Sequence, residues 1–340
     1  MTVRTDPYRL RRRWGVAAIG VATVAIGVAS LSLGAVDIPP GEVAGVLADQ
    51  VGLDLFDEPS ARATGVVWGL RVPRLLMGLL VGGALAATGV GLQGMLRNDL
   101  ADPHLLGIGP GAAIGAALGA SAGGVQGAIA GGIATGVLTA FVVRRLGRVA
   151  TADPNKLILS GVALGATLSA WVGFVVFGSD RAVVPPIEFW LLGSLSGSTW
   201  RGLGTVFVFL TVGVGALFGL ARTLDLLALG HREAAHLGVD VDLFTTILLI
   251  VVGATVGATV GVAGVVVFVG LLIPRVIRPV TGPFHRHMLL GSLVGGAGFV
   301  ALSDLVSRLA IEPVELPVGL VTSVVGGPLF LWLVSRRRNV

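Results

Sequence analysis

Apolar stretches recur along the whole chain, separated by short polar or charged segments. A helix that crosses a lipid bilayer needs about 20 mostly apolar residues. By this criterion we predict ten spans: 14–36, 67–92, 104–121, 124–144, 157–178, 201–221, 243–264, 266–280, 288–307 and 316–334. The eighth is the shortest, and Pro274 and Pro279 interrupt it. The pattern predicts an all-α polytopic membrane protein with about ten transmembrane helices.

The N-terminus resembles a signal peptide at first sight, because three arginines, Arg11 to Arg13, precede the first apolar stretch. That stretch is longer than the 7–15 residues of an ordinary signal-peptide core, and no small-x-small cleavage site follows it. We therefore expect an uncleaved first span. The predicted organisation is an N-terminal tail of residues 1–13, one transmembrane domain over 14–334, and a C-terminal tail of 335–340.

The composition supports a membrane protein and excludes several functional classes. Charged residues make up 13% of the chain, against about 25% in ordinary soluble domains. The absence of cysteine excludes disulfides, cysteine-ligated metals and thiol nucleophiles. The one lysine, Lys156, follows Asn155, so the Gly-Lys-Ser/Thr of a P-loop is absent and the chain does not hold ATP in that way.

The net charge of +5 is explained by membrane topology. Ten spans place both termini on one side of the membrane, and if that side is the cytoplasm, 18 of the 24 basic residues face it. The remaining six face outward: Arg62, Arg71, Arg74, Arg181, Arg201 and Arg308. This distribution obeys the positive-inside rule. Both termini are therefore predicted to be cytoplasmic, and no nucleic-acid partner is needed to explain the basic residues.

Glycines recur at every fourth position over 107–131, and again at 253, 257 and 261. This spacing places small residues on one helical face, where two backbones can approach closely. We favour tight helix packing, with a glycine-lined ligand path as the alternative. Since one straight helix cannot hold the whole first series, we expect a turn near 121–124.

Catalytic and metal-binding groups are scarce in the predicted spans. The five histidines form neither a His-Glu-x-x-His motif nor a pair at i, i+4, and we expect them to be solvated: His104, His231, His236, His285 and His287. A membrane-embedded enzyme would need a buried nucleophile or a metal cluster. A secondary transporter would need carboxylates at membrane depth for ion coupling, and the centres of the spans are nearly free of acids. We predict no catalytic residue, no metal site and no cofactor bound directly.

Charged residues near the outer ends of the spans are open to two interpretations. Arg71 and Arg74 flank Pro73 at the start of the second span, and Asp304 lies one helical turn before Arg308 in the ninth. They could be interfacial residues with an i, i+4 ion pair. Alternatively, the arginines could dock carboxylates of an extracytoplasmic partner, because Arg makes bidentate pairs with them.

The segment 222–242 differs from the other loops on the predicted cytoplasmic side. It is apolar enough to form two short helices with a hinge at Gly230, yet too polar to span the membrane. An exposed, half-apolar face of this kind favours a protein partner. A helix lying flat on the membrane lipid is the alternative.

Ordered sequence blocks resemble the FecCD family, the permeases of type II ABC importers for ferric siderophores, heme and cobalamin. The blocks are Leu70–Leu75, Val81–Ala86 followed by Gly89 and Gln93, Arg97–Pro103 with Leu106–Gly107, Phe268–Pro274, and Glu315–Gly319 with Gly327–Phe330. Segment 224–239 also resembles the coupling loop of the family. Together the blocks run from about residue 68 to 334.

The resemblance implies a type II ABC importer permease fold in the bacterial cytoplasmic membrane. It implies a homodimer with the pore at the subunit interface, although a heterodimer with a related permease stays open. Two cytosolic ATPase subunits, which use ATP and Mg, would bind on one side, and a substrate-binding protein would dock on the other. A ferric siderophore is the first substrate hypothesis because that branch of the family is the most populous, with heme and cobalamin as alternatives.

The resemblance also assigns site residues. Arg71, Arg74 and Arg308 would dock the binding protein, and Asn98, Leu100 and Asn155 would lie near the cytoplasmic gate. The predicted ATPase-coupling residues are Leu226, Leu227, Ala228, Leu229, Gly230, Ala234, Ala235, Leu237 and Gly238. Two positions depart from the family pattern: Asp99 stands where proline is usual, and Arg275 stands where histidine is usual.

Overall fold

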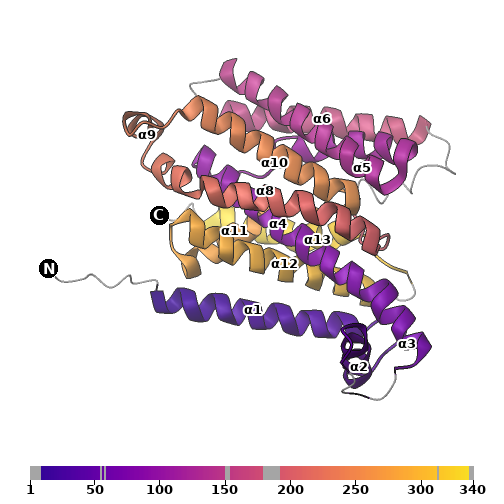
Figure 1. Cartoon of the computed structure of the whole chain (residues 1–340). Helices are drawn as coiled ribbons and strands as arrows, with labels where there is room; N and C mark the ends of the chain where they lie inside the picture. The colour runs from indigo at the N-terminus through magenta and orange to yellow at the C-terminus, as the bar shows by residue number, and fades with distance from the viewer. Residues whose placement is uncertain are drawn as a thin grey trace.

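The computed structural model describes residues 9–53, 56, 59–149, 154–178, 192–311 and 314–336, and every regular element in these ranges is helical. The helices, in chain order, are α1 (Arg9–Ser32), α2 (Pro40–Gln50), α3 (Ala61–Val66), the π-helical turn η1 (Val67–Arg71), α4 (Val72–Leu96), α5 (Ile108–Val149), α6 (Pro154–Gly178), α8 (Trp200–Leu227), α9 (His231–His236), α10 (Val241–Ala263), α11 (Val269–Thr281), α12 (His285–Leu309) and α13 (Val318–Arg336). Figure 1 shows the long helices side by side in one bundle.

The predicted all-α fold with about ten spans is confirmed. Within the described ranges, six continuous helical segments are long and apolar enough to cross a membrane: α1, α3 through α4, α5, α8, α10 and α12. α5 folds back on itself and so covers two predicted spans, and α6, α11 and α13 lie at the remaining three. Each helix lies within a few residues of its predicted range.

The turn expected near 121–124 divides α5 into two arms. Gly123 has φ −152° and ψ 24°, and Gly124 has φ 57° and ψ −142°, neither of which is helical. The positive φ of Gly124 is unfavourable for any residue with a side chain. The arms then pack backbone to backbone, because a Cβ on Gly119 would overlap the carbonyl of Gly127 and one on Gly131 would overlap that of Gly115.

Glycine contacts also join separate helices. A Cβ on Gly257 of α10 would overlap the carbonyl of Gly132 in the second arm of α5, and one on Gly296 of α12 would overlap that of Gly82 in α4. α4 is buried along most of its length and lies between α8 and α12 (Figure 1). The periodic glycines therefore serve close helix packing, as the sequence interpretation favoured.

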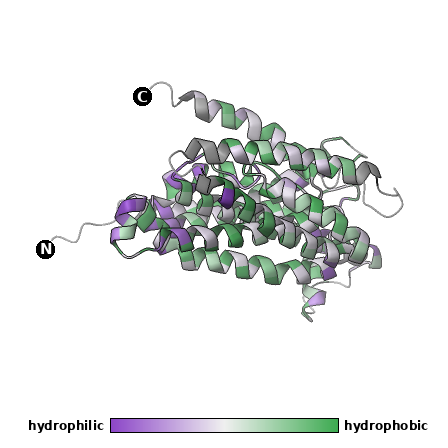
Figure 2. Ribbon diagram, turned by 90° about the horizontal axis from the view of Figure 1, so that it is seen from above, coloured by the Kyte–Doolittle hydropathy of each residue, from purple (hydrophilic) through white to green (hydrophobic). Residues whose placement is uncertain are grey.

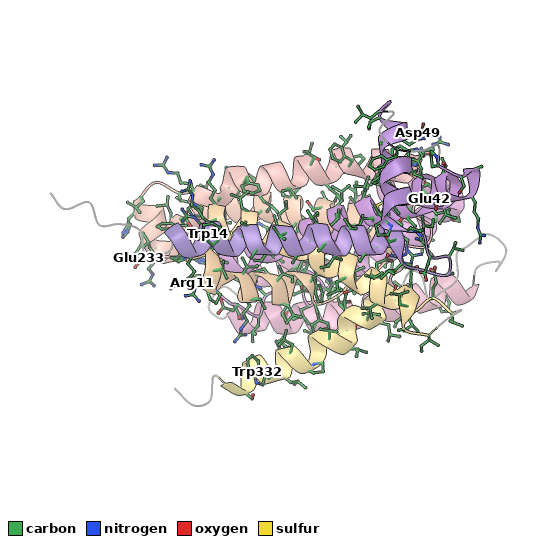
Figure 3. The ribbon with its side chains drawn as sticks, turned by 90° about the horizontal axis from the view of Figure 1, so that it is seen from below. Arg11, Trp14, Glu42, Asp49, Glu233 and Trp332 are labelled. Atoms are coloured by element: carbon green, nitrogen blue, oxygen red, sulfur yellow. The ribbon has the colours of Figure 1, made fainter. Side chains whose placement is uncertain are left out.

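The bundle has two polar ends. Figure 2 shows hydrophobic residues along the middles of the helices and most hydrophilic residues towards the ends. Figure 3 places Arg11, Trp14, Glu233 and Trp332 at one end, which we call the α9 end, and Glu42 and Asp49 at the other, which we call the α2–α3 end. α1 begins and α13 finishes at the α9 end (Figure 1), as an even number of spans requires.

The short helix α2 was not predicted, although the sequence carries a signal for it. Pro40 occupies the first helical position, where a missing N–H is harmless, and Glu42 lies in the first turn. Val43 and Val46 are three residues apart and buried against the outer parts of α1 and α4. At 11 residues, the helix is too short for a search based on spans.

The glycine contacts give the first testable prediction. Gly257→Ala adds one methyl group where no space exists, and overpacking of this kind costs about 1–3 kcal/mol. The purified variant should unfold at a lower temperature in detergent than the wild type. Gly219→Ala is the matched control, because a Cβ there has no neighbour within 4 Å. Equal melting temperatures for the two variants would contradict the packing role.

Candidate docking and coupling sites

Asp304 is the centre of a charged cluster at the α2–α3 end. It lies on α12 and is almost fully buried. Its carboxylate accepts hydrogen bonds from Nε of Arg74 at 2.9 and 3.2 Å, and one oxygen lies 3.3 Å from Nε of Arg308. The i, i+4 ion pair expected between Asp304 and Arg308 is therefore present. Since Arg74 belongs to the first turn of α4, the cluster ties α4 to α12.

Arg74 has a second carboxylate partner. Its Nη1 donates to both oxygens of Glu315, at 2.9 and 3.1 Å. The Arg74 side chain is 12% exposed and that of Glu315 is 46% exposed. Glu315 precedes α13, so this pair connects the start of α13 to α4 at the surface of the cluster.

Arg71 bonds to the backbone that leaves α1. Its guanidinium is buried and donates from Nη1 to the carbonyls of Leu31 at 2.7 Å and Ser32 at 2.9 Å, and from Nη2 to that of Val36. The π-helical turn η1 positions Arg71, with the N–H of Val72 reaching back five residues to the carbonyl of Val67. π-turns are frequent at functional sites.

Arg308 also forms hydrogen bonds to the end of α1. Its Nη2 donates to the carbonyl of Ser30 at 3.2 Å and to the Ser30 hydroxyl at 2.6 Å. The structure thus brings together the three arginines that the resemblance assigns to docking. In the single chain, their guanidinium groups bond to carbonyls, carboxylates and a hydroxyl of the same chain. The docking role stays a prediction.

The coupling segment 222–242 is partly as predicted. The hinge at Gly230 is present, with φ 136°, and α9 follows it. The first of the two predicted short helices is wrong, because α8 continues without a break to Leu227. Its apolar positions keep the helical spacing of the span, and Leu224 and Leu227 pack into the same core.

The nine predicted coupling residues divide into an anchoring set and an exposed set. Leu227, Gly230 and Ala234 are buried, and Leu226 is half-buried. The exposed members are Ala228, Leu229, Ala235, Leu237 and Gly238. Leu229 is 62% exposed and Leu237 is 60% exposed, so two large apolar side chains project from this end of the bundle.

Two histidines anchor the coupling segment to the bundle. His231 of α9 lies 3.3 Å from the carbonyl of Met95, near the end of α4. Asp225 of α8 accepts hydrogen bonds from the backbone N–H of His285 at 2.9 Å and is 2.7 Å from its Nδ1. The expectation of solvated histidines is wrong for His285, which is 5% exposed, and for His104, whose side chain is 8% exposed. His285 fits against Gly94, where a Cβ would overlap its ring.

The predicted gate residues lie near the α9 end. Asn98 and Leu100 form the turn after α4, where Oδ1 of Asn98 accepts the N–H of Leu100 at 2.9 Å. Asp99, at the position of the usual proline, pairs with Arg278 of α11 at 2.8 Å. Asn155 lies in the first turn of α6.

The loop after α4 packs directly on α6. A Cβ on Gly161 would lie 2.8 Å from Cα of Leu106, and one on Gly107 would lie 3.0 Å from the N of Gly165. The turn with Asn98 and the helix with Asn155 therefore belong to one packed unit. Arg275, the second departure from the family pattern, lies on α11 one turn before Arg278.

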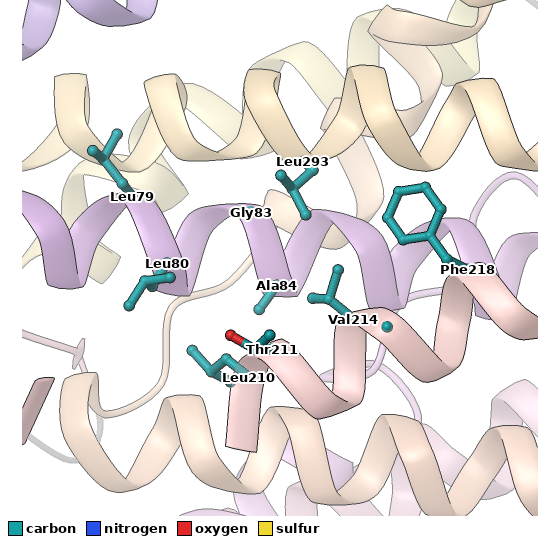
Figure 4. A pocket seen from close by; sticks show the side chains of 10 residues that line it. Leu79, Leu80, Gly83, Ala84, Leu210, Thr211, Val214, Phe218 and Leu293 are labelled. Carbon is teal, nitrogen blue, oxygen red and sulfur yellow. The ribbon is translucent and has the colours of Figure 1, made fainter. Parts of the chain in front are cut away.

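An apolar hollow of about 350 Å³ lies between α4, α8 and α12 at membrane depth (Figure 4). Its lining is leucine, valine, alanine, glycine and Phe218, and Thr211 supplies the one side-chain hydroxyl. Elsewhere in the described ranges, no three His, Asp or Glu residues lie close enough to hold a metal ion. The hollow has no group suited to covalent chemistry.

Known proteins match this chain over most of its length. The FecCD transport family matches residues 22–336. The vitamin B12 import system permease protein BtuC of Yersinia enterocolitica is 37% identical over 278 residues, which cover 81% of this chain and 83% of that protein. The hemin transport system permease protein HmuU of Yersinia pestis is 38% identical over 283 residues, which cover 80% of this chain and 84% of that protein.

A solved structure also matches. It is an inward-facing conformation of a metal-chelate type ABC transporter, with a TM-score of 0.79 and 30% sequence identity. The match covers 94% of this chain and 98% of that chain. The order and overall arrangement of the helices are therefore shared over 94% of this chain.

The charged cluster gives a stability prediction. Asp304→Asn leaves two largely buried guanidinium groups without their counter-charge, and breaking a buried ion pair costs about 3–5 kcal/mol. Thermal unfolding of the purified permease should therefore occur at a much lower temperature. Glu315→Gln is the matched comparison, since pairs with an exposed partner contribute about 0–1 kcal/mol. If both variants melt like the wild type, the cluster does not hold α4 and α12 together.

Proposed function

The chain belongs to the FecCD transport family and is a permease of an ABC importer, and within that class we propose that it carries a ferric siderophore. The observation that carries the importer assignment is the family match over residues 22–336 on an all-helical bundle, and the siderophore is chosen because that branch of the family is the most populous. Heme and cobalamin are the alternatives, because the named relatives transport hemin and vitamin B12.

Energy would come from a separate ATPase. The chain lacks a P-loop lysine, and its relatives are named as permease proteins of import systems. ATP and Mg would therefore be bound by a cytosolic partner at the α9 end, which by the positive-inside rule faces the cytoplasm. Two permease copies would form the pore at their interface.

The coupling segment is the proposed ATPase contact. Leu229 and Leu237 flank α9 and expose apolar surface to the solvent side of the bundle. Gly230 and Ala234 are buried where α9 packs on the bundle, His231 connects α9 to α4, and Asp225 of α8 connects the start of the coupling segment to α12. A movement of α9 would thus reach α4 directly and α12 through α8.

The proposed docking site for the substrate-binding protein is the charged cluster at the opposite end. Asp304 is buried, but Glu315 is half exposed and binds the outer face of Arg74. A carboxylate from the docking partner could replace Glu315 on Arg74 while Asp304 stays in place. Such an exchange would release the segment before α13, and Arg71 and Arg308 would keep α1 in position.

Transport requires two packings of the same helices that differ by a few kcal/mol. We propose that Asn98, Leu100 and Asn155 lie at the cytoplasmic gate of this alternation. The Asp99–Arg278 pair would hold the loop after α4 to α11 in one of the two states. Substrate passes unchanged through the pore, so no covalent step is needed.

Coupling can be tested with charge at the exposed leucines. Leu229→Asp with Leu237→Asp should remove the apolar contact and abolish substrate uptake and co-purification of the ATPase, while the permease still inserts. Val51→Asp is the matched control, because Val51 is 69% exposed at the opposite end of the bundle. Wild-type uptake by the double leucine variant would refute the coupling role.

Substrate and energy source can be tested together in sealed vesicles. Uptake of a labelled ferric siderophore should depend on ATP at the cytoplasmic face and should survive collapse of the ion gradients. Labelled hemin and cobalamin are measured in parallel. Uptake of one of these and not of the siderophore would replace the substrate assignment, and uptake driven by an ion gradient without ATP would contradict the ABC mechanism.

A further inference from the structure

A second hollow lies at the α2–α3 end, between the turn of α5 and the start of α8. It has a volume of about 220 Å³ and a lining that is about half polar and half apolar. Gly123, Gly124 and Gln126 contribute from the turn, and Thr199, Arg201 and Thr205 contribute from α8 and the residue before it. A Cβ at either glycine would meet nothing within 4 Å, so this side of the hollow is open.

Arg201 supplies the charge of this hollow. Its residue is exposed, and its guanidinium makes no hydrogen bond or ion pair with any described residue. The three arginines of the charged cluster differ, because carbonyls and carboxylates of the same chain already occupy them. Among the described residues, the lining has no carboxylate, so none of the lining residues that the structure describes compensates the positive charge of Arg201.

The backbone that carries Arg201 is held rigidly. The preceding residue, Trp200, donates from Nε1 to the carbonyl of Trp68 at 2.9 Å, and the two indole rings lie 4.6 Å apart. Thr199 caps α8 by accepting the N–H of Gly202 at 3.2 Å. Because the backbone at the start of α8 is fixed in this way, Arg201 loses less conformational entropy when it binds a partner, and this favours recognition.

The size of the hollow restricts its occupant. Pockets for whole small-molecule ligands are usually about 300–1,000 Å³, and a siderophore, heme or cobalamin is large even among these ligands. A volume of 220 Å³ fits one protruding side chain. Arg pairs with carboxylates in a bidentate geometry, and the side-chain amide of Gln126, a neutral donor, can bond to the same group.

We propose that this hollow binds an aspartate or glutamate side chain of the extracytoplasmic substrate-binding protein, with Arg201 as its counter-ion. The proposal rests on the importer function proposed above. It adds a docking contact between α5 and α8, separate from the cluster on α4 and α12. The binding protein would then hold the permease at two places whose spacing depends on the packing of these helices.

The test measures how tightly the binding protein binds the complete permease–ATPase complex in nanodiscs. The probe is the purified binding protein that stimulates ATP hydrolysis by the wild-type complex. Arg201→Gln should weaken its affinity about tenfold, as expected for a lost charged hydrogen bond, and Arg201→Glu should weaken it further. Higher salt should reduce the difference between wild type and variants. Size-exclusion chromatography checks that each variant complex assembles.

Arg62→Glu is the matched control, because Arg62 is also an exposed arginine at this end but lies on α3. The proposal expects a small effect there, and it expects Arg201→Glu to regain affinity when one acidic residue of the binding protein is changed to arginine. Unchanged affinity of Arg201→Glu, or an equal loss with Arg62→Glu, would overturn the Arg201 contact alone. If no binding protein stimulates the wild-type complex, the importer function fails and this contact fails with it.

Discussion

The fold depends on how helices associate inside a bilayer, where apolar side chains gain little by leaving lipid for one another. The bundle uses close backbone contact instead. Gly119 meets Gly127 within α5, Gly132 meets Gly257 of α10, and the same kind of contact joins α4 to α12. At these points no side chains interlock, so the two backbones can slide past one another locally. That property suits a protein whose function needs two packings of one bundle.

Polar interactions are concentrated at the two ends, and α12 takes part in both sets. At the α9 end, its first residue, His285, is bonded to Asp225 in the coupling segment. At the other end, Asp304 holds Arg74 and Arg308. A continuous helix of 25 residues thus connects the proposed ATPase contact to the proposed docking cluster. Motion at either end would be transmitted through a rigid element, whereas a loop would absorb it.

Most of the fold could be predicted from the sequence. A helix that spans the bilayer needs a minimum number of apolar residues, and the hydropathy pattern shows such stretches directly. The turn at Gly123–Gly124 followed from the same logic, since seven glycines in register do not fit one span. Helix α2 and the continuation of α8 to Leu227 were missed, because a search for spans ignores short helices and helices that extend beyond the membrane. The buried state of His285 depends on Asp225, 60 residues away, and no local pattern contains that contact.

The arginine cluster shows the limit of reading function from residue type. For Arg71, Arg74 and Arg308, the alternatives from the sequence were docking and an interfacial position with an Asp304–Arg308 ion pair. The geometry shows bonds within the chain for all three. Internal pairing does not prevent docking, since an ion pair with a half-exposed partner such as Glu315 can exchange at little cost. It does mean that reversing the charge of Arg71 would disturb three backbone carbonyls as well as any partner. The proposed docking by this cluster is therefore separable from folding at Glu315, and inseparable from it at Arg71 and at Arg74, which also holds the buried Asp304.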